Sequence, residues 1–306
     1  MASLIAPFAN ENPEQIALVD DFGETSWSDF NGRVNQLVHA LRSKGLRTGD
    51  AFAVVSGNRR EYFEAFAAAA HGGWLLVPVN WHLVAKEVAY ILADSGSKAL
   101  LVDSRFIELA EATMLQTERP NLEAVVIMGK EASVFADETE QAIAYEDFLS
   151  EQSSAEPGDQ LLGGPMFYTS GTTGHPKGVK SGLSQTGAPV EMLKMIGDGI
   201  SAMLGITPGG KSLLVGPVYH SAQWAFSFLP LLAGTSVVMR HRFDGEEVLK
   251  LVDKYQITNI HLVPTQFTRM LRLSDDIRKS FNGSSLTAVW HGAAPCPPQI
   301  KRQMIE

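Results

Sequence analysis

The chain has 306 residues, of which 45% are hydrophobic and 19% charged, as in ordinary folded enzymes of one or two domains. Its formal net charge of -9 argues against a general binder of nucleic acids or anionic membranes, because phosphate surfaces recruit basic proteins. The single cysteine, Cys296, excludes a disulfide framework and argues against a structural zinc site, so we expect a reducing, cytoplasmic location.

Short apolar runs alternate with helical periodicity along the first half of the chain. Phe30, Val34, Leu37, Val38 and Leu41 fall on one helical face, and a glycine at 45 can end that helix. Strands are expected at 51–55, 74–77 and 99–102, with helices around 62–70 and 84–92.

The second half repeats this rhythm. Strands are expected at 213–216, 236–239, 260–263 and 288–290, with helical stretches at 190–204 and 248–255. Such alternation predicts an α/β fold with mainly parallel sheets flanked by helices. The polar stretch 151–164 is the best internal boundary, which gives one α/β region at 1–160 and a second at 161–306, the two intertwined.

Ligands of such sheets bind in the loops that follow the carboxyl ends of strands. One such loop follows the apolar run 165–168 and holds hydroxyls, glycines and a lysine that suit an anion. The residues expected to bind phosphate are Thr169, Ser170, Gly171, Thr172, Thr173, Gly174 and Lys177. A merely flexible polar loop is the alternative interpretation.

The string Tyr-Thr-Ser-Gly-Thr-Thr-Gly-His-Pro-Lys-Gly-Val at 168–179 resembles the signature loop of the adenylate-forming superfamily. That superfamily includes acyl-CoA synthetases, luciferases and the adenylation domains of peptide synthetases. The resemblance implies an enzyme that binds ATP with Mg²⁺ and joins a carboxylate to AMP, releasing pyrophosphate. It also implies a catalytic role for Lys177 and a magnesium contact for Thr173.

Two later segments carry the same resemblance. Pro-Val-Tyr-His at 217–220 resembles the substrate-side motif, which implies a catalytic and substrate-binding role for His220. Trp224 stands where fatty acyl-CoA synthetases have a tryptophan that gates the acyl tunnel. A capping histidine and a core tryptophan are the alternatives. Most of the eight histidines are expected on the surface or in structural roles, and His220 is the exception.

The segment 291–295 resembles the loop that lies against the adenine and the acyl pocket. It implies nucleotide contacts for Gly292, Ala293, Ala294 and Pro295, and a substrate contact for Gly292 as well. Segments 49–58 and 72–80 agree with the same family, so the resemblance runs from about residue 15 to the last residue.

Two motif matches are rejected. Residues 205–212 fit the P-loop pattern, with Lys211 as its lysine, but they follow a helical stretch and enter a strand, whereas a P-loop follows a strand and opens a helix. Residues 197–202 fit a dinucleotide-binding glycine pattern, but no strand precedes them.

Members of the superfamily are usually longer. Beyond Pro295 we find no counterpart of their magnesium-holding glutamate, ribose-binding aspartate or C-terminal lid domain with its lysine. We therefore expect the chain to lack the C-terminal lid, and full turnover by this chain alone is not expected, since each lost electrostatic contact can cost a factor of about a hundred.

The resemblance predicts an AMP-forming acyl-CoA synthetase for a fatty or other hydrophobic acid, with ATP, Mg²⁺ and coenzyme A. The alternatives are an acyl-AMP ligase or adenylation domain that loads a carrier protein, and an inactive nucleotide-binding fragment. Neither a signal peptide nor a run of about 20 apolar residues is present. Peripheral membrane contact and a homodimer remain open.

Overall fold

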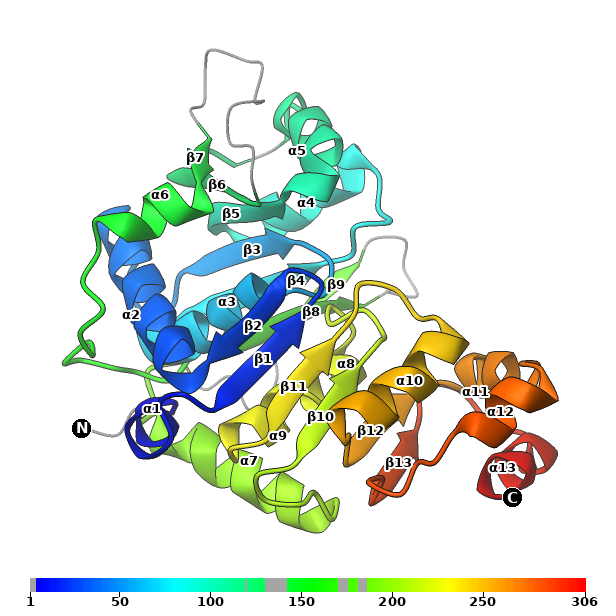
Figure 1. Cartoon of the computed structure of the whole chain (residues 1–306). Helices are drawn as coiled ribbons and strands as arrows, with labels where there is room; N and C mark the ends of the chain where they lie inside the picture. The colour runs from blue at the N-terminus through cyan, green and yellow to red at the C-terminus, as the bar shows by residue number, and fades with distance from the viewer. Residues whose placement is uncertain (1–3, 119, 130–141, 170–175, 181–185) are drawn as a thin grey trace. The chain divides into compact units, whose positions relative to one another are not determined.

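The computed structural model describes residues 4–118, 120–129, 142–169, 176–180 and 186–306. The chain forms two compact units (Figure 1). Unit 1 comprises Met1–Glu14 and Trp27–Leu193, and unit 2 comprises Gln15–Ser26 and Lys194–Glu306. The segment 15–26 therefore joins a unit that is otherwise built from the second half of the sequence. The division expected near residue 160 stays a prediction.

Unit 1 is built on a sheet with the strand order β7-β6-β5-β3-β4-β8-β9 within the described residues, parallel except for the antiparallel pair β8–β9. Its strands are β3 Ala51–Val55, β4 Leu75–Val79, β5 Ser97–Asp103, β6 Ala124–Met128, β7 Ile143–Ala144, β8 Gly164–Thr169 and β9 Lys177–Lys180. Its helices are α1 Ala6–Glu11, α2 Trp27–Ser43, α3 Arg60–Gly72, α4 Ala85–Ser95, the 3₁₀ turn η1 Ser104–Phe106, α5 Ile107–Met114 and α6 Tyr145–Ser150.

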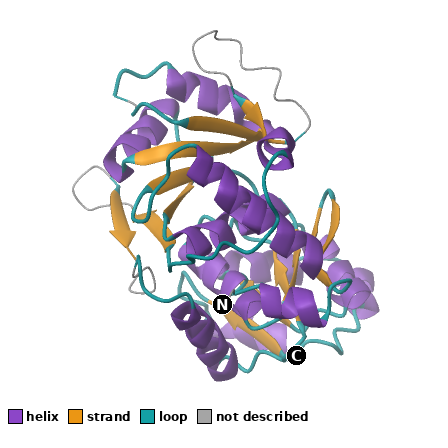
Figure 2. Ribbon diagram, turned by 90° about the vertical axis from the view of Figure 1, so that its left-hand side faces the viewer, coloured by secondary structure: helices purple, strands orange, loops and turns teal. Residues whose placement is uncertain are grey.

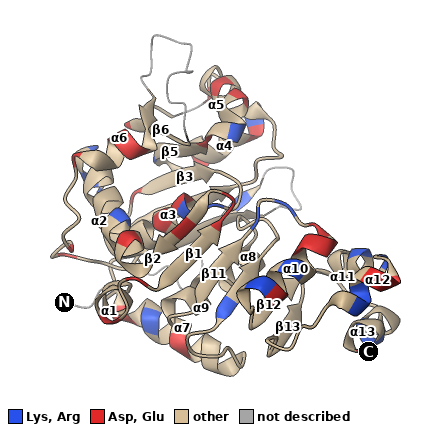
Figure 3. Cartoon of the chain, in the orientation of Figure 1, with Lys and Arg blue, Asp and Glu red and all other residues tan. Residues whose placement is uncertain are grey.

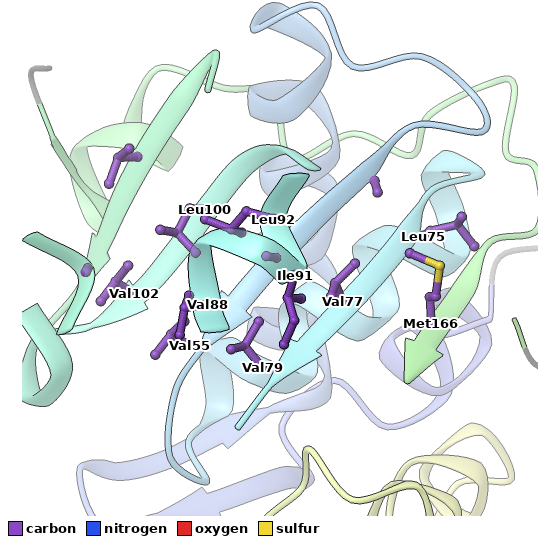
Figure 4. Close-up of a cluster of buried hydrophobic side chains, with 14 of the residues drawn as sticks. Val55, Leu75, Val77, Val79, Val88, Ile91, Leu92, Leu100, Val102 and Met166 are labelled. Atoms are coloured by element: carbon purple, nitrogen blue, oxygen red, sulfur yellow. The ribbon is translucent and has the colours of Figure 1, made fainter. Parts of the chain in front are cut away.

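Helix α4 packs on one face of this sheet through an apolar stripe (Figure 4). Val88, Ile91 and Leu92 are spaced at i, i+3 and i+4, so they project from one side of the helix. They meet strand residues such as Val77 and Leu100, which are fully buried. This packing holds α4 on β4 and β5, and β4 is the neighbour of β8, the strand that leads into the expected phosphate loop.

The polar stretch 151–164 lies in unit 1 and binds to helix α2. Asn35 Nδ2 donates to the carbonyl oxygen of Ser154 at 3.0 Å and to a Glu156 carboxylate oxygen at 3.0 Å. Arg42 and Asp159 form an ion pair of 2.7 Å. The polar residues of this stretch thus serve as hydrogen-bond partners of a helix.

Unit 2 is built on a sheet with the strand order β13-β12-β10-β11-β1-β2 within the described residues, parallel except for β1–β2. Its strands are β1 Ile16–Asp20, β2 Gly23–Ser26, β10 Lys211–Leu214, β11 Ser236–Met239, β12 Asn259–Leu262 and β13 Ala288–His291. Its helices are α8 Ser221–Ala225, α9 Phe228–Leu232, α10 Gly245–Tyr255, α11 Pro264–Leu271, α12 Asp275–Ser280 and α13 Pro298–Ile305, while α7 Glu191–Met203 crosses the boundary at 193.

The two faces of this second sheet carry different helices. Ile260 and Leu262 of β12 pack with Val248 of α10 and Phe267 of α11 in one apolar core. His261, which alternates with them along the strand, points to the other face and stacks against a ring that follows α8. The second face therefore offers a mixed aromatic and polar surface.

The expected fold class is confirmed, because both sheets are mainly parallel and helices flank them (Figure 2). Strands β3 and β11 carry no charged residue (Figure 3), as suits strands buried in a sheet. The hairpin β1–β2 and strand β6 were not among the expected elements. Within the described part of the chain, no helix combines the length and apolar character that a membrane crossing requires.

Candidate nucleotide and acid site

The expected phosphate loop begins where β8 ends and finishes where β9 begins. Thr169 and Lys177 are paired across these two strands. Strand β8 runs parallel to β4, so Thr169 lies at a carboxyl edge of the sheet, where ligands of α/β folds bind. Thr169 and Lys177 are exposed. The other expected phosphate contacts, Ser170, Gly171, Thr172, Thr173 and Gly174, lie outside the described residues.

Helix α4 holds both ends of this loop. The Tyr168 hydroxyl donates a 2.6 Å hydrogen bond to Asp94 Oδ2, and the Tyr90 hydroxyl donates to the carbonyl oxygen of Pro176 at 3.3 Å. Partial burial, together with the bond to Asp94, raises the pKa of Tyr168, so the phenol stays protonated as a donor. Gly178 faces this ring, and a Cβ there would lie 3.1 Å from Tyr168 Cζ.

In unit 2, three neighbouring strands bring the other expected residues to one edge. Strands β13, β12 and β10 are adjacent and parallel, so their carboxyl ends lie on the same side of the sheet. The segments that follow β10 and β13 hold the expected residues His220 and Gly292. Lys211, by contrast, is the first residue of β10 and follows helix α7, at the amino edge. The helix-to-strand context on which the P-loop match at 205–212 is rejected is therefore confirmed.

His220 and Trp224 are one helical turn apart, as expected. The Trp224 backbone N–H donates to the His220 carbonyl oxygen at 3.1 Å. Their side chains, however, have different surroundings. His220 is exposed and its ring lies 4.5 Å from that of Tyr219, whereas Trp224 is buried and stacks on Phe228 at 5.7 Å. His220 occupies the N-cap position of α8 without a side-chain capping bond. Their substrate roles stay predictions.

Although the His220 side chain is exposed to solvent, partial desolvation by its neighbours lowers its pKa, so the ring is neutral near pH 7. Burial also raises the pKa of Tyr219. A neutral imidazole and a protonated phenol can each donate one hydrogen bond to a carboxylate. Neither forms the strong ion pair that would stabilise the carboxylate in the ground state. This chemistry is compatible with a contact to the reacting acid.

A second pair of side chains, absent from the expected site, lies on the same segment. Gln223 Nε2 donates to His261 Nδ1 at 3.1 Å, and both residues are buried. The ring of Phe226 stacks on His261 at 4.5 Å and lies 5.0 Å from Trp290. Burial, and then the proximity of His291, lower the pKa of His261 to about 4, so this ring is also neutral at pH 7.

Glycines adapt the backbone to this pair. A Cβ at Gly216 would lie 2.5 Å from Gln223 Nε2, closer than any real contact, so only glycine leaves room for the amide. A Cβ at Gly292 would lie 3.2 Å from His261 Nε2. The next residue, Ala293, adopts a left-handed conformation with φ of 64°, which is strained for a residue with a Cβ.

The expected nucleotide loop 292–295 leaves β13 at the same edge. Ala293, Ala294 and Pro295 are exposed, and Gly292 is half-buried. The structure therefore brings Gly292 close to His261, while the contacts of Ala293, Ala294 and Pro295 with a nucleotide stay predictions. Among the described residues, no group of three or more histidine, cysteine, aspartate or glutamate side chains is placed to hold a metal ion.

Sequence reasoning passed over Gln223 and His261. A signal for His261 was available, because it is a titratable residue inside an apolar run that was expected to be a buried strand. No comparable signal marks Gln223, whose partner is 38 positions away in the sequence.

The family model of AMP-binding enzymes matches residues 6–306. The chain belongs to this family. Family membership therefore directs tests of ligand contacts to two places. One is the loop after β8, and the other is the edge formed by β10, β12 and β13.

Curated relatives are similar at low identity. The chain is 27% identical to 3-oxocholest-4-en-26-oate–CoA ligase of Rhodococcus rhodochrous, covering 100% of this chain and 57% of the relative. It is 28% identical to the fatty acid–[acyl-carrier-protein] ligase ScoC of Streptomyces coeruleorubidus, covering 94% of this chain and 52% of the relative. The chain thus spans about half the length of these relatives.

Solved structures share the fold. The inhibitor-bound N-terminal domain of FACL13 from Mycobacterium tuberculosis superposes with a TM-score of 0.80 at 22% identity, covering 99% of this chain and 72% of that one. The anthranilate CoA ligase AuaEII in complex with anthranoyl-AMP gives a TM-score of 0.81 at 20% identity, covering 98% of this chain and 56% of that one. At these identities the likeness concerns the fold alone.

Proposed function

We propose that the full-length protein uses ATP to convert a carboxylic acid into its acyl-adenylate, and then transfers the acyl group to coenzyme A. The observation that carries this proposal is that the hydroxyl-rich sequence 169–177 starts at Thr169, at the carboxyl end of a strand in a mainly parallel sheet, in a chain that matches the AMP-binding enzyme family from residue 6 to residue 306.

In the first step, a carboxylate oxygen attacks the α-phosphorus of ATP, the bond to the β-phosphate oxygen breaks, and pyrophosphate leaves. The protein must stabilise charge that develops on the leaving oxygens. Lys177 is suited to this task because it is exposed beside the loop, and Thr169 adds a hydroxyl donor at the opposite strand end. The Tyr168–Asp94 bond would keep the strand ends in place. Magnesium, when bound with ATP, would neutralise phosphate charge, and we assign its protein contact to Thr173.

In unit 2, the proposal assigns the acid to the edge formed by β10, β12 and β13. His220 and Gly292 are its expected contacts, and Trp224 contributes an indole ring that is buried on Phe228. The adenine is assigned to the loop 292–295. The apolar and aromatic side chains that follow β10, among them Trp224 and Phe228, suit a hydrophobic acid.

A carrier-protein thiol is the second candidate acceptor. It is favoured by one relative, a fatty acid–[acyl-carrier-protein] ligase that is 28% identical to this chain. Coenzyme A is favoured by the names of other relatives, including the 27% identical sterol acid–CoA ligase. Coenzyme A is therefore the first candidate acceptor.

Acid-dependent exchange of pyrophosphate into ATP tests the adenylation step without reference to the acceptor. We expect exchange that needs the acid, ATP and Mg²⁺ together. Supplying either coenzyme A or an acyl-carrier protein afterwards then identifies the acceptor from the thioester formed. If a broad panel of fatty, branched and aromatic acids supports no exchange by the full-length protein, the proposed function is wrong.

A further inference from the structure

The buried pair Gln223–His261 has a defined hydrogen-bond polarity. An amide NH₂ group only donates, so the contact of 3.1 Å between Gln223 Nε2 and His261 Nδ1 requires Nδ1 to accept. Because the ring is neutral at pH 7, its one proton then sits on Nε2. His261 therefore presents an N–H donor at the end of the ring opposite to Gln223.

This donor points toward the loop that follows β13. Nε2 is the atom that a Cβ at position 292 would approach, at 3.2 Å, and glycine at that position leaves the space beside Nε2 open. The hydrogen bond at Nδ1 is the one recorded for this ring within the described part of the chain. The Nε2–H group is therefore available to an acceptor that a ligand supplies.

The surroundings hold the donor in one orientation. Phe226 stacks on the imidazole plane with an interplanar angle of 13°. Gly216 leaves the room that the Gln223 amide occupies, since a Cβ there would come within 2.5 Å of it. The ring is thus fixed by stacking on its face and by a hydrogen bond at one edge, which is the arrangement of a pre-organised recognition group.

We propose that His261 is a specificity-determining residue of the acid site, which selects acids carrying a hydrogen-bond acceptor, such as a carbonyl oxygen, within the chain. Gln223 is a positioning residue that fixes the tautomer of His261. This inference rests on the proposed function, and it narrows the substrate class from hydrophobic acids in general to hydrophobic acids with one internal acceptor group.

The chemistry of such a site makes discrimination asymmetric. An acid with an acceptor at the right carbon forms a hydrogen bond with Nε2–H. A plain alkanoic acid of equal length leaves the same donor buried without a partner, and a built donor of this kind disfavours the analogue that cannot use it. We expect a preference of about tenfold or more for the matching oxo acid.

The test compares oxo acids, with the carbonyl placed at each successive carbon, against the alkanoic acid of the same length in pyrophosphate exchange by the full-length protein. For the wild type, we expect at least one carbonyl position to raise kcat/KM about tenfold. His261→Leu should bring that ratio to within about twofold of one, and His261→Gln, which keeps a donor, should recover part of it. Gln223→Met should lower the ratio less than His261→Leu does, because the neutral ring still carries its proton on Nε2 for part of the time.

Because the ratio is measured on one preparation, partial misfolding of a variant does not alter it. Gly292→Ala is a second variant, whose added methyl would sit 3.2 Å from Nε2 and should lower the same ratio. Equal or higher rates for the alkanoic acid at every carbonyl position, or an unchanged ratio in His261→Leu, would overturn this inference while leaving acid activation intact. Absence of exchange with every acid would instead overturn the proposed function, and this inference with it.

Discussion

Tyr168 and Asp94 connect strand β8 to helix α4 through a 2.6 Å hydrogen bond, one residue before the expected phosphate loop begins. The bond ties the start of the loop to a helix whose apolar stripe is fixed in the core of unit 1. A loop that binds phosphate must keep its donors in place before the ligand arrives, and this contact would supply part of that order.

We therefore expect Tyr168→Phe to lower the free energy of unfolding by about 1 kcal/mol, the usual net contribution of one hydrogen bond at a half-exposed site. In pyrophosphate exchange, KM for ATP should rise more than KM for the acid. Urea unfolding and exchange kinetics on the same variant check the two effects. If KM for the acid rises as much as KM for ATP, this hydrogen bond does not act through the phosphate loop.

Lys211 tests the choice between two loops. It begins strand β10 at the amino edge of the sheet in unit 2, and it is half-buried. Lys211→Ala should leave the Kd for ATP within about a factor of two, as for a charge that makes no contact with the ligand. Calorimetric titration with ATP gives the value directly. A loss of affinity of tenfold or more would return the P-loop match at 205–212 to consideration.

Trp224 tests the acyl pocket. If its indole borders the chain of the acid, each methylene buried there contributes roughly 0.8 kcal/mol, so four further carbons would add about 3 kcal/mol where they fit. We expect the full-length protein to prefer medium or long acids over acetate and benzoate, and we expect Trp224→Ala to shift the chain-length profile more than the affinity for ATP. A profile with its maximum at acetate, or an unshifted profile in the variant, would leave Trp224 as packing against Phe228 alone.

His71 makes stability depend on pH. It is fully buried in α3, neither ring nitrogen has a hydrogen-bond partner among the described residues, and burial lowers its pKa to about 4 against a partial opposing effect of Glu156. The unfolded chain, with an ordinary histidine pKa near 6.5, binds the proton more readily. Stability is therefore fully present above pH 6.5 and falls as the pH drops toward 4.

Between pH 7.5 and pH 5 this one group should cost about 2 kcal/mol of unfolding free energy. His71→Leu should remove that part of the pH dependence with little loss at pH 7.5, and His82→Leu, at an exposed histidine, should keep the wild-type slope. Urea titrations at the two pH values measure both. Identical slopes for the wild type and His71→Leu would contradict the assignment.

Elements with a strong local pattern could be predicted from the sequence. The apolar runs at 51–55 and 236–239 coincide with β3 and β11, and the stripe from Phe30 to Leu41 lies in α2. The hairpin β1–β2 could not be found this way, because β1 is held in its sheet by pairing with β11, which is distant in the sequence. Its residue Leu18 pairs with Val237, 219 positions later. The polar composition of the stretch 151–164 suggested a boundary. Composition alone could not show that these polar side chains bind to helix α2.

The candidate site divides in the same way. Lys177 and its loop are predicted from a contiguous motif, because a loop that binds phosphate through successive backbone and hydroxyl groups has a local pattern, and their phosphate contacts stay a prediction. The Gln223–His261 pair left none, because its geometry depends on the adjacency of β10 and β12 and on two glycines in other segments. Sequence spacing also placed His220 and Trp224 one turn apart, but it could not foresee that one is exposed and the other buried.

The central claim, that the loop between Thr169 and Lys177 holds the phosphates of ATP during acid activation, is tested most directly by acid-dependent pyrophosphate exchange in Lys177→Ala of the full-length protein. Lys180→Ala is the matched control, since Lys180 is also exposed in β9 but pairs with Met166 at the other end of the hairpin. We predict a fall in exchange rate of about a hundredfold for Lys177→Ala, with acid affinity almost unchanged, and an effect within about twofold for Lys180→Ala. An exchange rate for Lys177→Ala equal to that of the wild type would contradict the claim.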